Sequence, residues 1–453
     1  MRNVLRYIFA AGLLVPACSG QALLDEVNFR NTQFGGIQLV GMSLYSGYST
    51  SAYPQTGSAF TPSPGVGLLG ADVNYGASAT LGWQRHRPKG DISVRYRGAY
   101  GGMVRYSGLN AFSESLSISA SRRLAPKWTF TISATGQDTT LAEYLYEPST
   151  LSVISGVPAT FDDLAAALSV GQYSNSQIAS MLTGAPVMMQ TSGRSLLLGN
   201  RVLSYSANAA LTYALSSRLN VHFASFAAAG KTRLGGQDGV APTYEMPRSL
   251  GANAGIGFSY SLSPRTEVGA NLDENRTVNR LQSAYISTAN AYLGRKMGLH
   301  WFLRVQGGGT YSDFAQTTVG SPKTRQTVGG GSLGYRTHTH TVTATYDRSA
   351  MDTYGFAVGT VTTISSAWNW HLPGSRWHTF ASFGEQQTRN TGFTSLSGWQ
   401  TSAGIATFLA PHATLSAQYV YLNSTGSYLG TFENLSIHSV RISLGWAPQA
   451  ALR

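Results

Sequence analysis

ISVRYRGAY, residues 92–100, is the stretch of sequence that decides the fold. Apolar and polar residues alternate along it with a period of two, which is the spacing of side chains that point to opposite faces of a β-strand. One face carries an isoleucine, a valine and two tyrosines, whereas the other carries Ser93, Arg95, Arg97 and Ala99. A strand of this kind lies between an apolar environment on one side and a polar environment on the other.

The same alternation recurs along most of the chain, at residues 252–262, 301–311, 341–346, 415–421 and 440–446. Short turn-forming connections such as 87–90 and 263–265 alternate with longer connections rich in Ser, Thr and Gly, such as 49–65 and 235–249. Strands of a soluble β-sandwich average ~5–6 residues, and their connections are not sorted in this way. The pattern therefore predicts an all-β fold, a transmembrane antiparallel up-and-down β-barrel of about 18 strands, with 16 as the alternative count.

The composition agrees with a barrel and disfavours three other classes of protein. Only 11% of the 453 residues are charged, against roughly 25% in soluble globular domains, which argues against an ordinary soluble enzyme. Disordered chains are highly charged and poor in aromatic residues, whereas 11% of this chain is aromatic. After residue 20 no apolar run approaches the ~20 residues of a membrane-spanning helix, which argues against a helical membrane protein.

The N-terminal region is predicted to be a secretory signal peptide, with two arginines, an apolar stretch and a small-x-small cleavage site that ends at Ala22. A lipoprotein signal with lipidation at Cys18 is the alternative. Cleavage after Ala22 would remove the only cysteine and two arginines, so the net charge would become 12 − 2 = +10. The predicted divisions are a signal peptide at 1–22, a short periplasmic segment at 23–35, the barrel at 36–446 and a tail at 447–453.

Residues 439–446 alternate between polar and apolar side chains and end on Trp446. This segment resembles the C-terminal insertion signal of Gram-negative outer-membrane β-barrels, which the barrel-assembly machinery reads. The family usually stops at the aromatic residue, whereas residues 447–453 follow it here. The resemblance implies a porin-like barrel in the bacterial outer membrane, surrounded by outer-membrane lipid and lipopolysaccharide. General porins are often trimers, so an oligomer is a further possibility that the resemblance raises.

Residues 141–194 break the strand pattern. Residues 160–168 are typical of an N-capped short helix with acids in its first turn, and residues 175–182 are typical of a second helix. By strand count this is the third external loop, which in general porins folds into the lumen and narrows the pore. We therefore expect one long, partly helical external loop that constricts the lumen. A cap packed on neighbouring loops is the alternative.

Tryptophans gather near the turn ends of the predicted strands. Amphipathic rings are favoured at the headgroup level of a bilayer, where barrels carry aromatic girdles. Tryptophans also fill soluble cores, but seven near equivalent strand ends favour a girdle. Its expected members are Trp83, Trp128, Trp301, Trp368, Trp370, Trp377 and Trp446.

Basic residues dominate the predicted inner face of the barrel. A charge that faces lipid at the bilayer midplane costs roughly 2–4 kcal/mol, which favours the lumen for charged strand residues. The predicted lumen-lining arginines are Arg95, Arg97, Arg105, Arg304, Arg336 and Arg441. Acidic candidates on the same face are Glu267, Asp273 and Asp347. Because a ring of cations favours anions in a pore, we predict anion selectivity; arginines that pair with these acids and stiffen the wall are the alternative.

Signatures of catalysis and of metal binding are weak. Residues 330–334 satisfy G-x-S-x-G, but that motif needs a strand-to-helix elbow and lies here within a β pattern. His338 and His340 flank one residue of a predicted turn and have no third metal ligand beside them. The positive charge is scattered along strands, which disfavours nucleic acid as a partner. We expect no catalytic residue, no metal and no cofactor.

The sequence therefore predicts an outer-membrane pore through which small polar or anionic solutes diffuse. Two alternatives stay open at this point. One is a non-conducting structural or interaction barrel. The other is a barrel that exports polysaccharide.

Overall fold

The structure is a computed structural model that describes residues 36–50, 71–105, 110–140, 201–233, 248–279, 282–316, 323–352, 358–390, 394–410, 413–428 and 431–446. The predicted signal peptide, the N-terminal segment and the C-terminal tail lie outside these residues. So do Cys18 and the insertion at 141–194.

Eighteen antiparallel strands make up the described part of the chain. They are β1 (Gln38–Ser49), β2 (Asp72–Arg87), β3 (Gly90–Met103), β4 (Ala111–Ala125), β5 (Trp128–Thr140), β6 (Arg201–Ala214), β7 (Leu219–Arg233), β8 (Ser249–Ser263), β9 (Thr266–Asn279), β10 (Gln282–Met297), β11 (Trp301–Gln316), β12 (Lys323–Arg336), β13 (His340–Asp352), β14 (Val358–His371), β15 (Trp377–Asn390), β16 (Thr394–Ala410), β17 (Ala413–Tyr428) and β18 (Thr431–Trp446).

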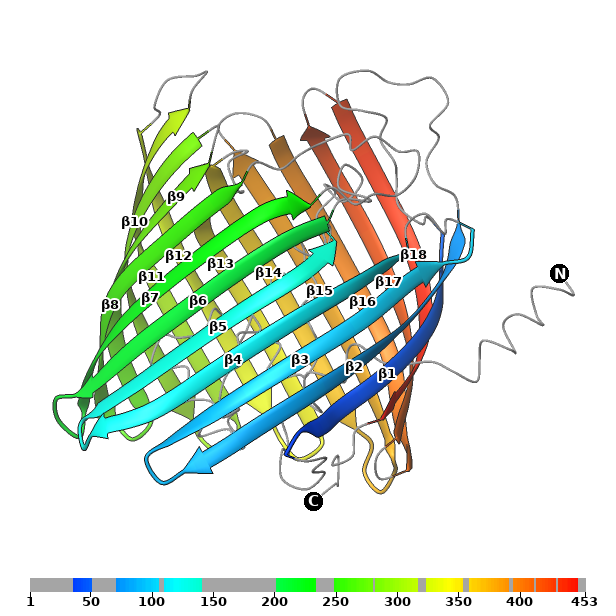
Figure 1. The fold of residues 1–453 in the computed structure, drawn as a ribbon, viewed down its shortest axis with the longest axis horizontal. Coiled ribbons are helices and arrows are strands. Elements are labelled where there is room, and N and C mark those ends of the chain that lie inside the picture. The colour runs from blue at the N-terminus through cyan, green and yellow to red at the C-terminus, as the bar shows by residue number, and fades with distance from the viewer. Residues whose placement is uncertain are drawn as a thin grey trace, which may run out of the picture.

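Each strand pairs with its neighbours in the chain, and the first and last strands pair with each other. The β1–β18 register runs from Met42↔Trp446 to Ser49↔Ser439, which closes the sheet. The result is one up-and-down barrel whose strands are strongly tilted (Figure 1). The predicted fold class and the count of 18 strands are confirmed, and the alternative count of 16 is wrong.

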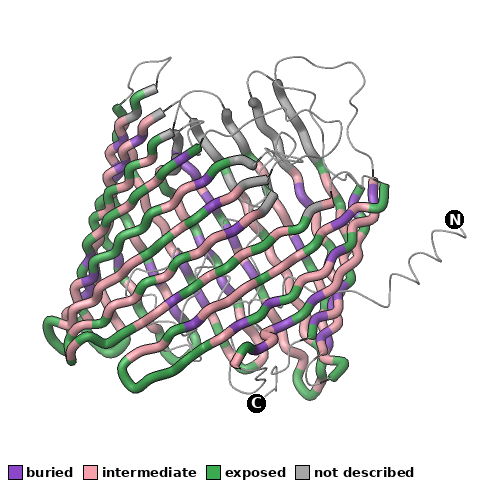
Figure 2. Tube along the Cα trace, in the orientation of Figure 1, coloured by how far each residue is buried: buried purple, intermediate pink, exposed green. Residues whose placement is uncertain are grey.

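The strands form because their side chains alternate between two environments. On β8, Leu250, Ile256 and Phe258 are exposed on the outside, and the three glycines and the asparagine at alternate positions between them face inward. Large apolar side chains are exposed in this way on strand after strand, and Figure 2 shows the alternating exposure along the chain. An apolar outer surface of this extent requires lipid, so the barrel is a membrane-spanning one. Among the described residues, no helix is long and apolar enough to cross a membrane.

Small hydroxyl side chains line much of the inner face. On β4, every second residue from Ser113 to Ser121 is an inward-facing serine. Hydroxyl pairs join neighbouring strands on this face, with oxygen–oxygen distances of 2.6 Å for Ser93–Ser119, 2.7 Å for Ser382–Ser402 and 2.8 Å for Ser416–Ser443. These pairs satisfy polar atoms on the wall while they leave the lumen wide.

At one end of the barrel, which we call the turn end, two to five residues join consecutive strands. Examples are Pro88 and Lys89 between β2 and β3, and residues 372–376 between β14 and β15. Gly298 and Gly374 lie in two of these turns with φ of 65° and 71°. This left-handed conformation favours glycine because it has no Cβ.

At the opposite end, which we call the loop end, the long connections are confined to the first half of the barrel. They span residues 50–71, 141–200 and 234–248, and the insertion at 141–194 belongs to the third connection, between β5 and β6. From β9 onward the loop-end connections have only two to six residues. The regular alternation of short and long connections that the sequence predicted is therefore wrong for the second half.

Candidate functional site

Arg97 on β3 faces the lumen and is exposed to it. Its cross-strand partners are Thr80 on β2 and Ser115 on β4. The residues two positions away from these partners, on the same face, are serine or glycine, so no acidic side chain adjoins Arg97 on the wall. Arg95 lies on the same face of β3, one inward position closer to the turn end.

Arg441 on β18 faces the lumen on the same side of the barrel. Its guanidinium carbon lies 4.5 Å from the ring centroid of Tyr45 on β1, and its cross-strand partners are Gly47 and Gln418. A cation–π contact holds the guanidinium against the wall and leaves its charge in place. We use the name arginine wall for Arg95, Arg97 and Arg441.

Arg304 on β11 also faces inward, but it is only 3% exposed because a polar network surrounds it. Its guanidinium carbon lies 4.7 Å from the ring centroid of Tyr292 on β10. The Tyr292 hydroxyl donates a hydrogen bond of 3.0 Å to Glu267 on β9, and the carboxylates of Glu267 and Asp347 act electrostatically on Arg304. Gly294 lies between Arg304 and Glu267 in the register, so no side chain separates the two groups.

Carboxylates and amides continue along this part of the inner face. We use the name acid wall for the inward-facing His222, Glu267, Asn271, Asp273, Gln306 and Asp347. Nε2 of His222 lies 3.1 Å from Oδ1 of Asn271, and Nε2 of Gln306 donates a hydrogen bond of 3.4 Å to Asp347. In the ring of 18 strands β11 is 11 − 2 = 9 strands from β2, so the acid wall faces the arginine wall across the lumen.

The two remaining arginines that the sequence placed in the lumen lie at the ends of the barrel. Arg336 is the last residue of β12, faces inward at the turn end and is exposed. Arg105 lies two residues beyond the end of β3, where no strand register assigns its side chain to a face. Its backbone N–H donates a hydrogen bond of 3.0 Å to the carboxylate of Asp72. The six arginines therefore do not form one ring.

The β13–β14 ribbon bends into the lumen at the loop end. Ala350 lies on the side of β13 that faces lipid further down the strand, yet it packs against the inward-facing Ala284 and Ile286 of β10. On β14, Thr360 lies on the same side of the ribbon and donates a hydrogen bond of 2.7 Å to the inward-facing Gln326 of β12. The ribbon therefore covers the inner surface of β10–β12 and narrows the lumen beside the acid wall. The constriction that the sequence predicts at residues 141–194 lies outside the described residues.

We expect Ala350→Glu to move the ribbon end away from the wall and to raise single-channel conductance. The substitution places a charge against Ala284 and Ile286, and burial of an unpaired charge is strongly unfavourable. Ser349→Glu is the matched control, because the neighbouring residue is exposed and lies on the opposite side of β13. Conductance that changes equally in both variants would contradict the contact.

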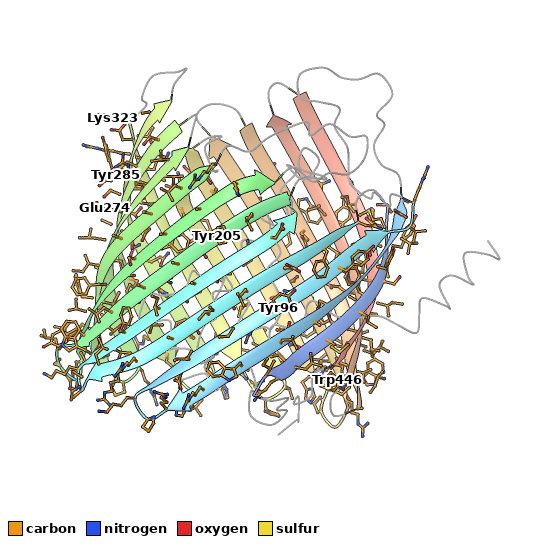
Figure 3. The ribbon with its side chains drawn as sticks, in the orientation of Figure 1. Tyr96, Tyr205, Glu274, Tyr285, Lys323 and Trp446 are labelled. Atoms are coloured by element: carbon orange, nitrogen blue, oxygen red, sulfur yellow. The ribbon has the colours of Figure 1, made fainter. Side chains whose placement is uncertain are left out.

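The predicted girdle tryptophans occupy outward positions near the turn end. They are Trp83, Trp128, Trp301, Trp368, Trp370, Trp377 and Trp446. Trp128 stacks on Tyr213 with 4.3 Å between ring centroids, and Trp446 is visible at the turn end in Figure 3. Trp399 is not one of the predicted girdle residues; it faces outward nearer the loop end, with its ring centroid 4.9 Å from that of Tyr421.

Solved barrels of similar length overlay on this chain. No protein-family model and no curated protein matches the sequence. The crystal structure of Pseudomonas aeruginosa OccK2 (OpdF) with glucuronate is 9% identical with a TM-score of 0.44, and the match covers 91% of this chain and 98% of that one. P. aeruginosa OpdK with vanillate is 10% identical (TM-score 0.43, coverage 90% and 97%), and Acinetobacter baumannii OccAB4 is 9% identical (TM-score 0.43, coverage 90% and 97%).

The weak chemical motifs occupy structural positions on the barrel wall. Residues 330–334 lie within β12, and no helix follows this strand. His340 is the first residue of β13, and its ring stacks against Trp370 with 5.8 Å between centroids. Within the described ranges, no group of three His, Cys, Asp or Glu side chains is placed to hold a metal ion.

Proposed function

We propose that the barrel lies in a bacterial outer membrane and forms a water-filled pore through which small polar or anionic solutes diffuse. The observation that carries the proposal is the pair Arg97 and Arg441, which have no acidic neighbour on the wall. Cations without adjoining acids attract anions that pass along the wall, and serines beside them offer hydrogen bonds. Arg304 is buried beside the carboxylates of Glu267 and Asp347, so it stabilises the wall and does not attract anions.

The sign of the inner face supports a preference for anions. Among the side chains that the structure describes, the inward-facing basic residues are Arg95, Arg97, Arg123, Lys296, Arg304, Arg336 and Arg441. The inward-facing acidic residues are Asp72, Asp91, Glu267, Asp273 and Asp347. Bases outnumber acids by seven to five; three of the acids belong to the acid wall, and Asp72 and Asp91 lie near the two ends of β2 and β3, away from Arg97.

Planar-bilayer recording of the refolded full-length chain tests the proposal. We expect ion-conducting steps and, under a salt gradient, a reversal potential of the sign that anion preference gives. A reversal potential of the opposite sign would contradict the basic lumen. Absence of conductance would instead favour the non-conducting structural barrel. Conductance without discrimination between small anions and cations would overturn the anion preference and leave a pore for small polar solutes.

Deletion of residues 141–194 is expected to increase single-channel conductance. We propose that this segment enters the lumen, and its removal would widen the narrowest part of the pore. Deletion of 236–246, from another long connection at the loop end, is the matched control and should leave conductance unchanged. Equal conductance of the two deletion variants would argue that residues 141–194 cap the surface.

Export and assembly belong to the same proposal. Residues 1–22 would direct the chain across the inner membrane, with loss or lipidation of Cys18 at that step. The barrel-assembly machinery would recognise β18 through its alternating pattern and its terminal Trp446. Association of several barrels is compatible with this arrangement.

A further inference from the structure

The outer face of β9–β12 carries polar and charged side chains near the loop end, in two rows that follow the strand register. The first row is Arg276↔Tyr285↔Asp313↔Lys323. The second row, one outward position closer to the turn end, is Glu274↔Ser287↔Tyr311↔Arg325. We call these eight residues the polar grid. Glu274, Tyr285 and Lys323 are seen together on the outside of the barrel in Figure 3, at the end opposite Trp446.

Contacts within the polar grid engage its acids more than its arginines. Nζ of Lys323 lies 3.7 Å from Oδ2 of Asp313, and the Tyr285 hydroxyl hydrogen-bonds to Glu274. Arg276 and Arg325 lie at opposite corners of the polar grid and are both exposed. The grid therefore offers two exposed guanidinium groups to whatever lies against this part of the wall.

The depth of the polar grid matches the headgroup level of a bilayer. A transmembrane strand crosses the hydrocarbon layer in about 9–11 residues. Trp301 and Tyr335 pair on the outside at the turn end, and their strands reach Tyr311 and Arg325 after 311 − 301 = 10 and 335 − 325 = 10 residues. The second row thus lies where the hydrocarbon ends, and the first row lies beyond it.

Below the polar grid the outer surface is uncharged and consists mostly of small residues. Six of the eight residues in the next two outward rows are alanine or glycine; the rows are Leu272↔Ala289↔Gly309↔Thr327 and Ala270↔Ala291↔Gly307↔Gly329. Side chains of this size leave room for flexible chains to pack against the backbone. The face is therefore divided into a charged upper part and an uncharged lower part of mostly small residues.

Charge separates the polar grid from the rest of the outer surface. The grid contains three cations and two acids. Elsewhere in the loop-end half, the described charged strand side chains on the lipid-facing side are three acids and two bases, Glu114, Asp138, Lys231, Arg348 and Glu385, which together carry a net charge of 2 − 3 = −1. An anionic headgroup is therefore best accommodated on β9–β12.

We infer that the polar grid binds the phosphorylated headgroup of lipopolysaccharide in the external leaflet, with acyl chains on the small-residue surface below it. Arg276 and Arg325 donate charge-assisted hydrogen bonds to phosphate oxygens, which suit the planar guanidinium group. An amphipathic lipid has the same division into anionic head and apolar tail as this face of the barrel. The inference rests on placement of the barrel in an outer membrane and is independent of conduction.

Native mass spectrometry of the refolded full-length barrel in detergent tests the inference by titration with lipopolysaccharide. We expect Arg276→Gln/Arg325→Gln to lose about tenfold in bound lipid, the size expected when charge-assisted contacts are removed. Arg276→Lys/Arg325→Lys should keep most of the binding. Arg295→Gln is the matched control, because Arg295 faces outward on β10 at the turn end and should retain full binding.

Lipopolysaccharide that has been treated with phosphatase serves as the second probe. Because it lacks phosphate, it should bind equally to the parent chain and to the double glutamine variant. Equal binding of both lipids to the parent chain would overturn the inference, as would equal loss in Arg295→Gln. A change in the number of chains per particle with unchanged lipid binding would overturn it in favour of an interface between copies. Arg325→Gln alone supplies the measurement if the double variant fails to fold. Intact conductance with absent lipid binding would reject the lipid site and leave the pore in place.

Discussion

Replacement of Arg304 by methionine is expected to lower the free energy of unfolding of the barrel by about 3–5 kcal/mol. The substitution removes a cation that is 3% exposed and leaves the carboxylates of Glu267 and Asp347 without it. Methionine keeps a side chain of similar length, so the loss reports the charge and not a cavity. Urea unfolding of the barrel refolded in lipid bilayers, followed by tryptophan fluorescence, gives the change in midpoint.

Arg97→Gln is the matched control for this measurement. Arg97 also faces the lumen, but it is exposed and has no acid beside it on the wall, so its unfolding free energy should change by less than about 0.5 kcal/mol. Addition of Glu267→Gln to Arg304→Met should restore part of the stability, because the variant then buries one fewer uncompensated charge. Equal losses for Arg97→Gln and Arg304→Met would contradict the buried network.

The alternation of side chains was sufficient to predict the barrel, because every strand has one face toward lipid and one face toward water. Each strand therefore shows the same apolar and polar pattern. The stretch at 92–100 lies in β3, with Tyr100 exposed on the outer face and Arg97 on the inner face. The face of a residue is a local property, since it depends only on its position along one strand. This is why the inward orientation of Arg304 and Arg441 could also be predicted.

The pairing of those arginines could not be predicted, because it depends on the register between strands. Glu267 and Arg304 are 304 − 267 = 37 residues apart and meet across Gly294 of the intervening strand β10. The alternation within each strand contains no information about this register. A glycine at an inward position between two strands with charged inward residues is the one signal of this contact that the sequence contains.

The inward bend of the β13–β14 ribbon was not visible in the sequence for a related reason. Counted with a period of two along β13, Ala350 falls on the same face as the lipid-exposed Tyr346, although Arg348 between them already interrupts the apolar pattern of that face. What covers a face is decided by tertiary packing, here against Ala284 and Ile286. Two local indications were the charge of Arg348 and the small size of Ala350, at positions that the count assigns to lipid.

Neutralisation of the exposed cations of the arginine wall should remove much of the anion preference of the pore. We expect Arg97→Gln/Arg441→Gln to shift the reversal potential under a salt gradient toward zero. An anion that passes about 8 Å from one charge in water gains about 0.5 kcal/mol, so two charges change its partitioning by roughly fivefold. Low ionic strength is required for the recording, since the Debye length is about 10 Å at 0.1 M salt.

Two further variants make this measurement specific to the arginine wall. Arg295→Gln removes the same charge from the lipid-facing side of β10 and should leave the reversal potential unchanged. Arg97→Lys/Arg441→Lys keeps the charge and should keep the selectivity, although lysine lacks the planar group that lies over Tyr45. Loss of selectivity in the lysine variant would show that solutes are held by guanidinium hydrogen bonds. Unchanged selectivity in the glutamine variant would contradict the role of Arg97 and Arg441. The anion preference would then have to come from other groups in the lumen, because the acid wall favours cations.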